Sequence, residues 1–223
     1  MIGDATCHQG WGSALLLRLY ESLTLSDPAT QRVDLIYVMA GKMERKDYGL
    51  ELYRAGLSPR LALGVGRFEV SKMYKIALEP AVVQELIALR DKTPADQRHF
   101  IVELEPSGVF IEKRRLRRWS TYGEILDLRD WLKAKNLQRV MVISTDVHLR
   151  RVKLTCRKVF RGSPVVFLYS AVPPGFASPK KDGWWTRSGD RRFVIKELLK
   201  LMGYRMILSL PAPASRRLMR LQD

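Results

Sequence analysis

Apolar runs alternate with amphipathic segments along most of this chain. The run over 140–143 is continuously apolar and the run over 33–39 is apolar apart from Asp34, which is typical of strands buried on both faces of a parallel sheet. Further strands are expected at 60–64 and 164–169, and segments with helical spacing lie at about 43–55, at 121–135 and from Asp146 onward. This alternation predicts an α/β fold, a Rossmann-like three-layer sandwich with a mainly parallel central sheet.

The remaining segments predict a less regular set of elements. An amphipathic helix is expected at about 12–25, and two strands at 100–104 and 109–112 could pair as a hairpin. A turn over 64–66 leads into a helix that contains Glu69 and Met73, and a second helical piece after Pro80 runs to about 89. Residues 170–190 predict a long loop, 192–201 a helix that ends at Gly203, and 204–210 a last strand. We therefore divide the chain into an amphipathic lead-in over 1–30, a single α/β domain over 31–210 and a basic tail over 211–223.

The size and composition fit one globular domain. The chain has 223 residues, of which 46% are hydrophobic, enough for a substantial core. The most apolar stretch, 14–17, is soon interrupted by Arg18 and Glu21, so we predict neither a transmembrane helix nor a signal peptide. A cytoplasmic protein is expected, although this amphipathic segment could place it at a membrane surface. Two cysteines and three histidines argue against a disulfide framework and against a structural zinc site.

The chain is strongly basic, with a formal charge of +16. Basic residues cluster at 113–118, 150–161, 180–192 and 216–220. Such a surface attracts polyanions, which include nucleic acid, anionic lipid headgroups and phosphorylated small molecules. No zinc-finger, RNA-recognition or basic-zipper pattern is present, so we expect no specific nucleic acid partner. A solvated basic surface without a partner would explain the charge equally well.

Polar or glycine-containing turns follow the predicted strands. In open α/β sheets ligands bind beyond the carboxyl ends of the strands, where glycines let the backbone approach a ligand and helix N-termini favour anions. These turns therefore predict a site for a phosphate-bearing molecule. The candidate residues, in chain order, are Gly41, Arg45, Gly64, Gly66, Glu69, Ser120, Thr121, Glu124, Ser144, Asp146, His148 and Arg151.

Each of these features also has a simpler explanation when it is taken alone. Ser144 and Asp146 are good helix caps, and Thr121-x-x-Glu124 matches a capping box. The glycines over 64–66 could form an ordinary tight turn, and Arg45 could be an exposed helix residue. The order and spacing of the whole set favour the site.

That order resembles the ElyC/SanA/YdcF family, also called domain of unknown function 218. The resemblance covers about 33–204, and two departures are a Gly-Val-Gly turn at 64–66 in place of Ser-Gly-Gly and fewer glycines at 40–42. Many members also carry an N-terminal membrane helix. The resemblance implies a Rossmann-like domain with a shared polar pocket and a bacterial protein of the cell envelope, although the family has no established reaction. The matching motifs are the first strand with Gly41 and Arg45, the helical segment 49–56, the 64–66 turn with Glu69, the group Ser120, Thr121 and Glu124, the group Ser144, Asp146, His148 and Arg151, and the late residues Trp184, Trp185, Glu197 and Lys200.

Three hypotheses for the function follow. In the first, the protein binds or acts on a phosphate-bearing small molecule or a lipid-linked phosphate. Arg45 and Arg151 hold the anion, and the glycines supply backbone N–H groups. His148 and Asp146 are the candidate catalytic residues, with His148 as general acid or base. Asp146 is also grouped with Glu69 and Glu124 as a carboxylate that orients the ligand or holds a divalent metal.

The second and third hypotheses need less chemistry. A nucleotide- or S-adenosylmethionine-binding module without catalysis would use Glu69 to hold a ribose-like diol. A basic protein that associates with an anionic membrane or with nucleic acid would need only the charge. The sequence leaves open whether the protein is an enzyme.

Overall fold

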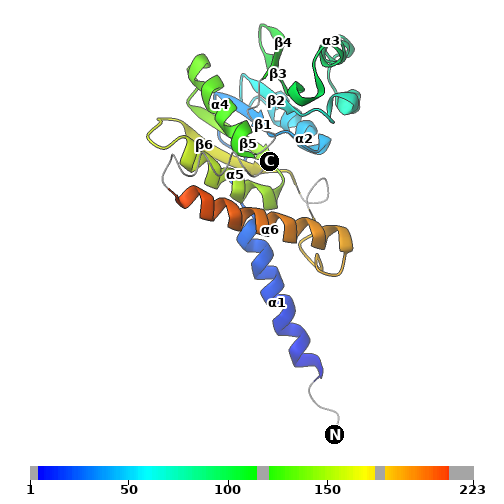
Figure 1. Ribbon diagram of the computed structural model, residues 1–223, viewed down its shortest axis with the longest axis vertical. Helices are drawn as coiled ribbons and strands as arrows, with labels where there is room; N and C mark the ends of the chain where they lie inside the picture. Colours follow the sequence, from blue (N-terminus) through cyan, green and yellow to red (C-terminus); the bar gives the residue numbers. More distant parts are fainter. Residues whose placement is uncertain (1–4, 115–120, 174–178, 211–223) are drawn as a thin grey trace.

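The computed structural model describes residues 5–114, 121–173 and 179–210, and it confirms the α/β architecture (Figure 1). The six strands form one sheet in the order β4-β3-β2-β1-β5-β6. Strands β2, β1, β5 and β6 are parallel, and β3 and β4 add an antiparallel hairpin beside β2. The strands are β1 Leu35–Val38, β2 Leu61–Val65, β3 Phe100–Glu105, β4 Gly108–Lys113, β5 Arg139–Ser144 and β6 Val166–Ala171.

Helices cover both faces of the sheet because the central strands are apolar on both faces. In β1, Ile36 and Val38 belong to the core formed with α2, η1 and α3, whereas Leu35 and Tyr37 belong to the core formed with α4 and α5. This alternation produces the three layers that the sequence predicts. The helices are α1 Ala5–Leu23, α2 Met43–Arg54, η1 Val70–Lys75, α3 Pro80–Asp91, η2 Ala95–Gln97, α4 Thr121–Lys135, α5 Asp146–Val159 and α6 Ser188–Ser209.

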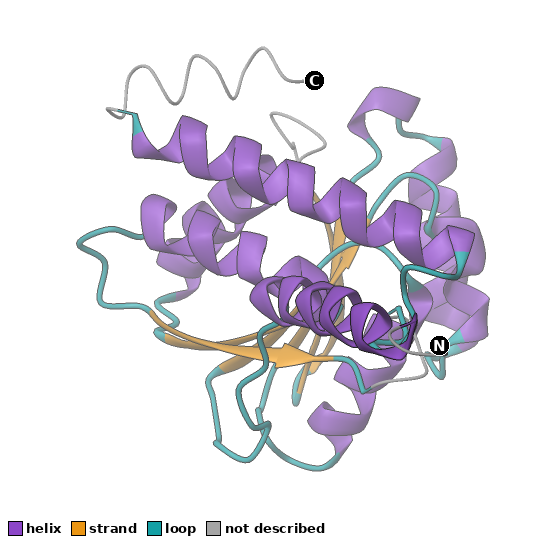
Figure 2. Cartoon of the chain, turned by 90° about the horizontal axis from the view of Figure 1, so that it is seen from below, coloured by secondary structure: helices purple, strands orange, loops and turns teal. Residues whose placement is uncertain are grey.

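Helices α1 and α6 add a further layer outside α4 and α5. Figure 1 and Figure 2 show α6 running along the outside of the domain, with α1 projecting beside it. Tyr20 and Leu23 of α1 pack with Val194 and Leu201 of α6, and all four side chains are buried. The C-terminal half of the lead-in helix is therefore packed on the domain.

The lead-in also reaches the outer edge of β6. Asp27 donates its N–H to the Tyr169 carbonyl at 2.6 Å and accepts the Tyr169 N–H on its carboxylate at 2.9 Å. The hydroxyl of Ser26 accepts the N–H of Ala171 at 3.1 Å. Residues directly after α1 thus satisfy backbone groups of the last strand.

The predicted strand over 204–210 is wrong, because α6 continues through Gly203 to Ser209. Tyr204, Ile207 and Leu208 are spaced for one helix face and are buried against α4 and α5. Glycine inside a helix costs about 1 kcal/mol relative to alanine, and the burial of this apolar face outweighs that cost.

Other expected boundaries shift by a few residues. Gly64 and Val65 belong to β2, so the turn that follows this strand starts at Gly66, and Glu69 is the N-cap of the short helix η1. Helix α1 begins at Ala5, earlier than expected. The tail over 211–223 lies outside the described residues. Within the described part of the chain, no helix combines the length and the apolarity needed to cross a bilayer.

Candidate functional site

The candidate residues gather at the carboxyl ends of β1 and β5. Strand order reverses here, because the chain passes from β1 to β2 on one side and places β5 and β6 on the other. Val38, the last residue of β1, is level with Leu63 and Ile143, so the three central strands end within two residues of one another. The loops after β1 and β5 therefore diverge at a topological switch point, the place where open α/β sheets bind ligands.

Arg45, in the first turn of α2, lies between these two loops and is only 7% exposed. It donates from Nη1 to the Ala40 carbonyl at 2.8 Å and from Nη2 to the Thr145 hydroxyl at 3.2 Å. Its guanidinium lies against Gly41, whose φ is +139° and where an added Cβ would lie 2.7 Å from Nη1. Gly41 is thus needed both for its backbone conformation and for the room it leaves Arg45.

The charge of Arg45 is not neutralised by direct contact. Among the described residues, no carboxylate forms an ion pair with it, and its buried Nε has no hydrogen-bond partner. Burial lowers the pKa of Arg45, and the more distant carboxylates of Glu124, Glu69 and Glu197 oppose that effect. The switch point therefore contains a buried guanidinium with an unused donor.

Glu124 of α4 reaches the same loop from the other face of the sheet. Its Oε1 accepts the backbone N–H of Ala40 at 2.8 Å and the hydroxyl of Tyr37 at 3.2 Å. A Cβ at residue 64 would lie 3.0 Å from this oxygen and 3.0 Å from the Val38 carbonyl, so Gly64 is required for space. Glu124 and Arg45 thus contact the backbone N–H and the backbone carbonyl of the same residue, Ala40.

Burial raises the pKa of Glu124 from 4.5 to about 7, and the nearby carboxylate of Glu69 contributes to the rise. The Ala40 N–H, the Tyr37 hydroxyl and Arg45 oppose it. Because the folded state holds this proton more tightly than the unfolded state, the carboxyl destabilises the fold increasingly as pH rises from about 4.5 to about 7. Glu124 is therefore positioned to exchange a proton near neutral pH.

His148 of α5 is held between two hydroxyls. Its Nδ1 lies 2.8 Å from Ser144 Oγ, and its Nε2 lies 3.2 Å from Thr121 Oγ1. Burial lowers the pKa of His148 well below its usual value, and the guanidinium groups of Arg151 and Arg45 lower it further. The imidazole is therefore neutral at physiological pH, with one nitrogen donating and the other accepting.

Arg151 differs from Arg45 because it is fully paired. It donates to both oxygens of Glu197 of α6, with the shortest distance 2.8 Å, and also to the hydroxyl of Thr121. Its guanidinium also lies over the Tyr204 ring, 5.3 Å from the centroid. Arg151 therefore connects α5, α6 and α4.

The two remaining carboxylates have other partners. Asp146 accepts the Tyr20 hydroxyl on Oδ2 at 2.7 Å and the Val147 N–H on Oδ1 at 2.7 Å, so these bonds tie it to α1 and to its own helix. Glu69 forms an ion pair of 2.5 Å with the fully buried Lys46.

The structure thus brings most of the sequence-predicted residues together. Arg45, Gly41, Gly64 and Glu124 surround the backbone of Ala40, while Ser144, His148, Thr121 and Arg151 form an adjoining chain of hydrogen bonds. Gly66 follows β2 and is buried, and its carbonyl accepts the Glu69 N–H at 2.9 Å. Ser120 lies outside the described residues.

The capping explanation accounts for little of this set. Thr145 is the N-cap of α5, but its side chain makes no capping hydrogen bond and instead accepts from Arg45. Glu124 Oε1 accepts from β1 and the loop after it. These contacts between separate elements indicate a built site.

Sequence reasoning missed Lys46, Tyr37 and the role of Thr145. Lys46 carries a charge in a helix whose neighbours are also charged, which gave no reason to place it inside. It is 0% exposed because Glu69 compensates it. Tyr37 is part of an apolar run, and its hydroxyl partner Glu124 is far away in sequence. Within the described residues, no group of three or more His, Cys, Asp or Glu side chains is placed to hold a metal ion.

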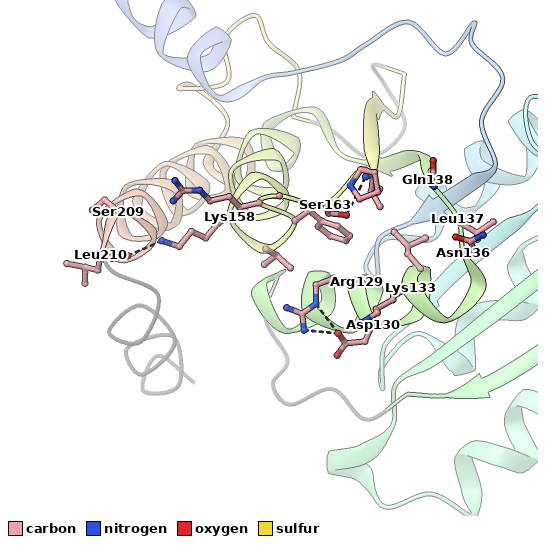
Figure 3. Close-up of a pocket in the computed structure, with 17 residues that line it drawn as sticks. Arg129, Asp130, Lys133, Asn136, Leu137, Gln138, Lys158, Ser163, Ser209 and Leu210 are labelled. Carbon is pink, nitrogen blue, oxygen red and sulfur yellow. Dashed lines mark hydrogen bonds and ion pairs between the residues drawn. The ribbon is translucent and has the colours of Figure 1, made fainter.

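A pocket of about 1,020 Å³ lies at the opposite edge of the sheet (Figure 3). Its lining includes the C-terminal ends of α4, α5 and α6 and four cations, Arg129, Lys133, Lys158 and Arg161. Cations are favoured at helix C-termini, and Lys158 indeed donates to the Leu210 carbonyl at 2.9 Å. Arg129 pairs with Asp130 at 2.7 Å. Local partners therefore account for Arg129 and Lys158, two of the four cations, and the switch point, with its buried Arg45, is the better candidate site.

Comparison of the chain with protein-family models, with curated proteins and with solved structures finds no match. The functional argument therefore rests on the site itself.

Proposed function

We propose that this protein binds a phosphate-bearing small molecule at the switch point between β1 and β5, with Arg45 as the main anion-binding group. The observation that carries the proposal is the buried Arg45 guanidinium, which has an unused Nε donor and no carboxylate partner among the described residues. A buried charge is costly unless it is paired and hydrogen-bonded. A phosphate group supplies the missing charge and matches the geometry of guanidinium.

Two neighbouring features support an anion at this position. Thr145 places the N-terminus of the 14-residue helix α5 beside Arg45, and the partial positive charge there favours an anion. Gly41 leaves the loop after β1 without a side chain on the surface that contacts Arg45. Together these features favour an anion over a neutral ligand.

The geometry gives the two arginines different roles. The charge of Arg151 is compensated by Glu197, so we assign Arg151 a structural role in place of the anion-binding role that the sequence suggested. The proton-exchanging role moves from His148 to Glu124. His148 is buried between hydroxyls with a strongly lowered pKa, whereas Glu124 has a pKa of about 7 and, like Arg45, bonds to the backbone of Ala40.

The same anion chemistry would serve a soluble sugar phosphate, a nucleotide or a lipid-linked phosphate of the bacterial cell envelope. The alternative of a nucleotide- or S-adenosylmethionine-binding module assigned a ribose diol to Glu69. That carboxylate is already paired with Lys46 at 2.5 Å, which argues against the assignment. Among these ligands, those with a phosphate are therefore favoured.

A thermal-shift experiment tests the proposal. Wild-type protein, Arg45→Gln and the control Arg54→Gln are compared with inorganic phosphate, sugar phosphates, nucleotides, polyprenyl-phosphate analogues and S-adenosylmethionine. Arg54 lies on the same helix and donates to the Ala77 carbonyl, away from the switch point. A ligand at 100 times its Kd stabilises the fold by about 2.7 kcal/mol.

We expect at least one phosphate-bearing compound to stabilise the wild type and Arg54→Gln but not Arg45→Gln. An equal shift in Arg45→Gln would refute the assignment of Arg45. A shift with S-adenosylmethionine and with no phosphate-bearing compound would favour the binding-module alternative instead.

A further inference from the structure

The outer face of α6 carries a continuous stripe of exposed apolar side chains. Ile195, Leu199, Met202 and Met206 are 44%, 63%, 53% and 71% exposed. Their spacing of four, three and four residues places them on one side of the helix, opposite the buried side that packs on α4 and α5. We call these four residues the α6 stripe. Exposed apolar residues that are contiguous mark an interaction surface, whereas scattered ones do not.

Basic residues flank the α6 stripe. Arg191, Arg192, Lys196, Lys200 and Arg205 are all exposed. Helix α6 contains two acidic residues, and both are already paired: Asp190 with Arg187, and the buried Glu197 with Arg151 and, at 3.3 Å, with Lys200. The surface is therefore apolar along its centre and positive along its margins.

We propose that this face of α6 docks on an anionic lipid bilayer. An apolar stripe with basic margins is the pattern of helices that lie in the membrane interface, where the apolar side chains enter the acyl boundary and the cations contact anionic headgroups. Pairing of two copies through the stripe would bring the same five cations of each copy together. The stripe is aliphatic and has no aromatic side chain on which a nucleic acid base could stack.

The membrane contact therefore falls on α6, whereas the sequence pattern pointed to the N-terminal amphipathic segment. The C-terminal end of that segment is occupied in the structure, because Tyr20 and Leu23 are 2% and 0% exposed, which leaves Leu15, at 70%, as its exposed large apolar side chain among the described residues. This inference rests on the outer face of α6 and is independent of the phosphate site. Helix α6 approaches that site with its buried side, where Glu197 pairs with Arg151. The two proposals can therefore fail separately.

Vesicle co-sedimentation of the full chain tests the inference. Vesicles of phosphatidylcholine alone are compared with vesicles of phosphatidylcholine and phosphatidylglycerol in equal amounts. Leu199→Gln with Met206→Gln removes two apolar side chains of the stripe, and each loss should weaken binding about tenfold. Arg192→Gln with Lys196→Gln removes two flanking cations, and each loss should weaken binding to the anionic vesicles about fivefold.

Matched controls separate this face from the general charge. Tyr74→Gln removes an apolar side chain that is 70% exposed on η1, and Lys72→Gln with Lys92→Gln removes two exposed cations elsewhere. We expect both controls to bind anionic vesicles as the wild type does, and unfolding midpoints would confirm that every variant is folded.

Three results would overturn the inference. One is that the wild type does not bind the anionic vesicles. Another is that the Lys72 and Lys92 control loses as much binding as the Arg192 and Lys196 variant, which would mean that net charge acts without the stripe. The last is a wild-type dimer in sedimentation equilibrium that Leu199→Gln with Met206→Gln dissociates, which would assign the face to a second copy.

Discussion

Two buried arginines should differ sharply in how much stability the same substitution costs. Arg151 is paired with Glu197, whose side chain is 7% exposed and has Lys200, at 3.3 Å, as its other cation. Arg151→Met leaves that carboxylate buried beside a half-exposed lysine. Breaking a buried ion pair in this way costs about 3–5 kcal/mol, which lowers the Tm of a domain of this size by roughly 6–20 °C.

Arg45→Met should have a much smaller effect. It removes two hydrogen bonds, to the Ala40 carbonyl and to the Thr145 hydroxyl, each of which contributes about 1.5–3 kcal/mol when the donor is charged. It also removes a buried, uncompensated charge, whose desolvation costs several kcal/mol. The two terms nearly cancel, so we expect the free energy of unfolding to stay within about 1 kcal/mol of the wild type.

Urea unfolding in a buffer without phosphate or sulfate measures both variants. Arg151→Met with Glu197→Leu serves as the control, because replacement of a whole buried pair by apolar residues is often neutral. It should recover most of the stability that Arg151→Met loses. If Arg45→Met costs as much as Arg151→Met, then Arg45 is already compensated in the ligand-free protein, and the argument for a missing anion fails.

Two further predictions concern Glu124 and Gly64. Because burial raises the pKa of Glu124 from 4.5 to about 7, Glu124→Gln should match the stability of the wild type below pH 4.5 and exceed it by up to about 3 kcal/mol above pH 7. Urea unfolding at several pH values measures this difference, which would be absent if the carboxyl titrates normally. Gly64→Ala should destabilise the protein by about 1–3 kcal/mol, since the new Cβ meets Glu124 and the Val38 carbonyl. The control Gly203→Ala, in an open helical position, should stabilise the protein by up to about 1 kcal/mol. Equal melting temperatures for the two alanine variants would contradict this account of Gly64.

The sequence predicts the local elements well where one period dominates. Helix α4 spans Thr121–Lys135 as expected, and the strands around Tyr37 and Val142 are buried on both faces. The prediction fails at 204–210, because an apolar run that ends a long helix has the same composition as a strand. Only the packing of Tyr204 on α4 and α5 distinguishes the two.

The sequence indicates where the candidate residues gather better than it indicates their partners. Strand ends and turn residues indicate the switch point, because chain order and the parallel sheet fix where those ends meet. The partner of each polar side chain cannot be predicted in the same way, because the partners are distant in sequence. Arg151 pairs with Glu197, 46 residues later, and Asp146 accepts from Tyr20, 126 residues earlier. No local pattern specifies which charged side chain reaches which partner, so the contrast between Arg45 and Arg151 becomes visible only in three dimensions.

The hydrogen bonds from Ser26 and Asp27 to β6 have a consequence for how the molecule behaves in a crowded solution. An uncovered outermost strand presents unpaired N–H and C=O groups, which act as a template for a foreign strand and thereby seed aggregation. Here the groups of Tyr169 and Ala171 that face outward are already used by the segment that follows α1. The lead-in thus closes this border of the sheet against strand addition, a protective role that is separate from any ligand.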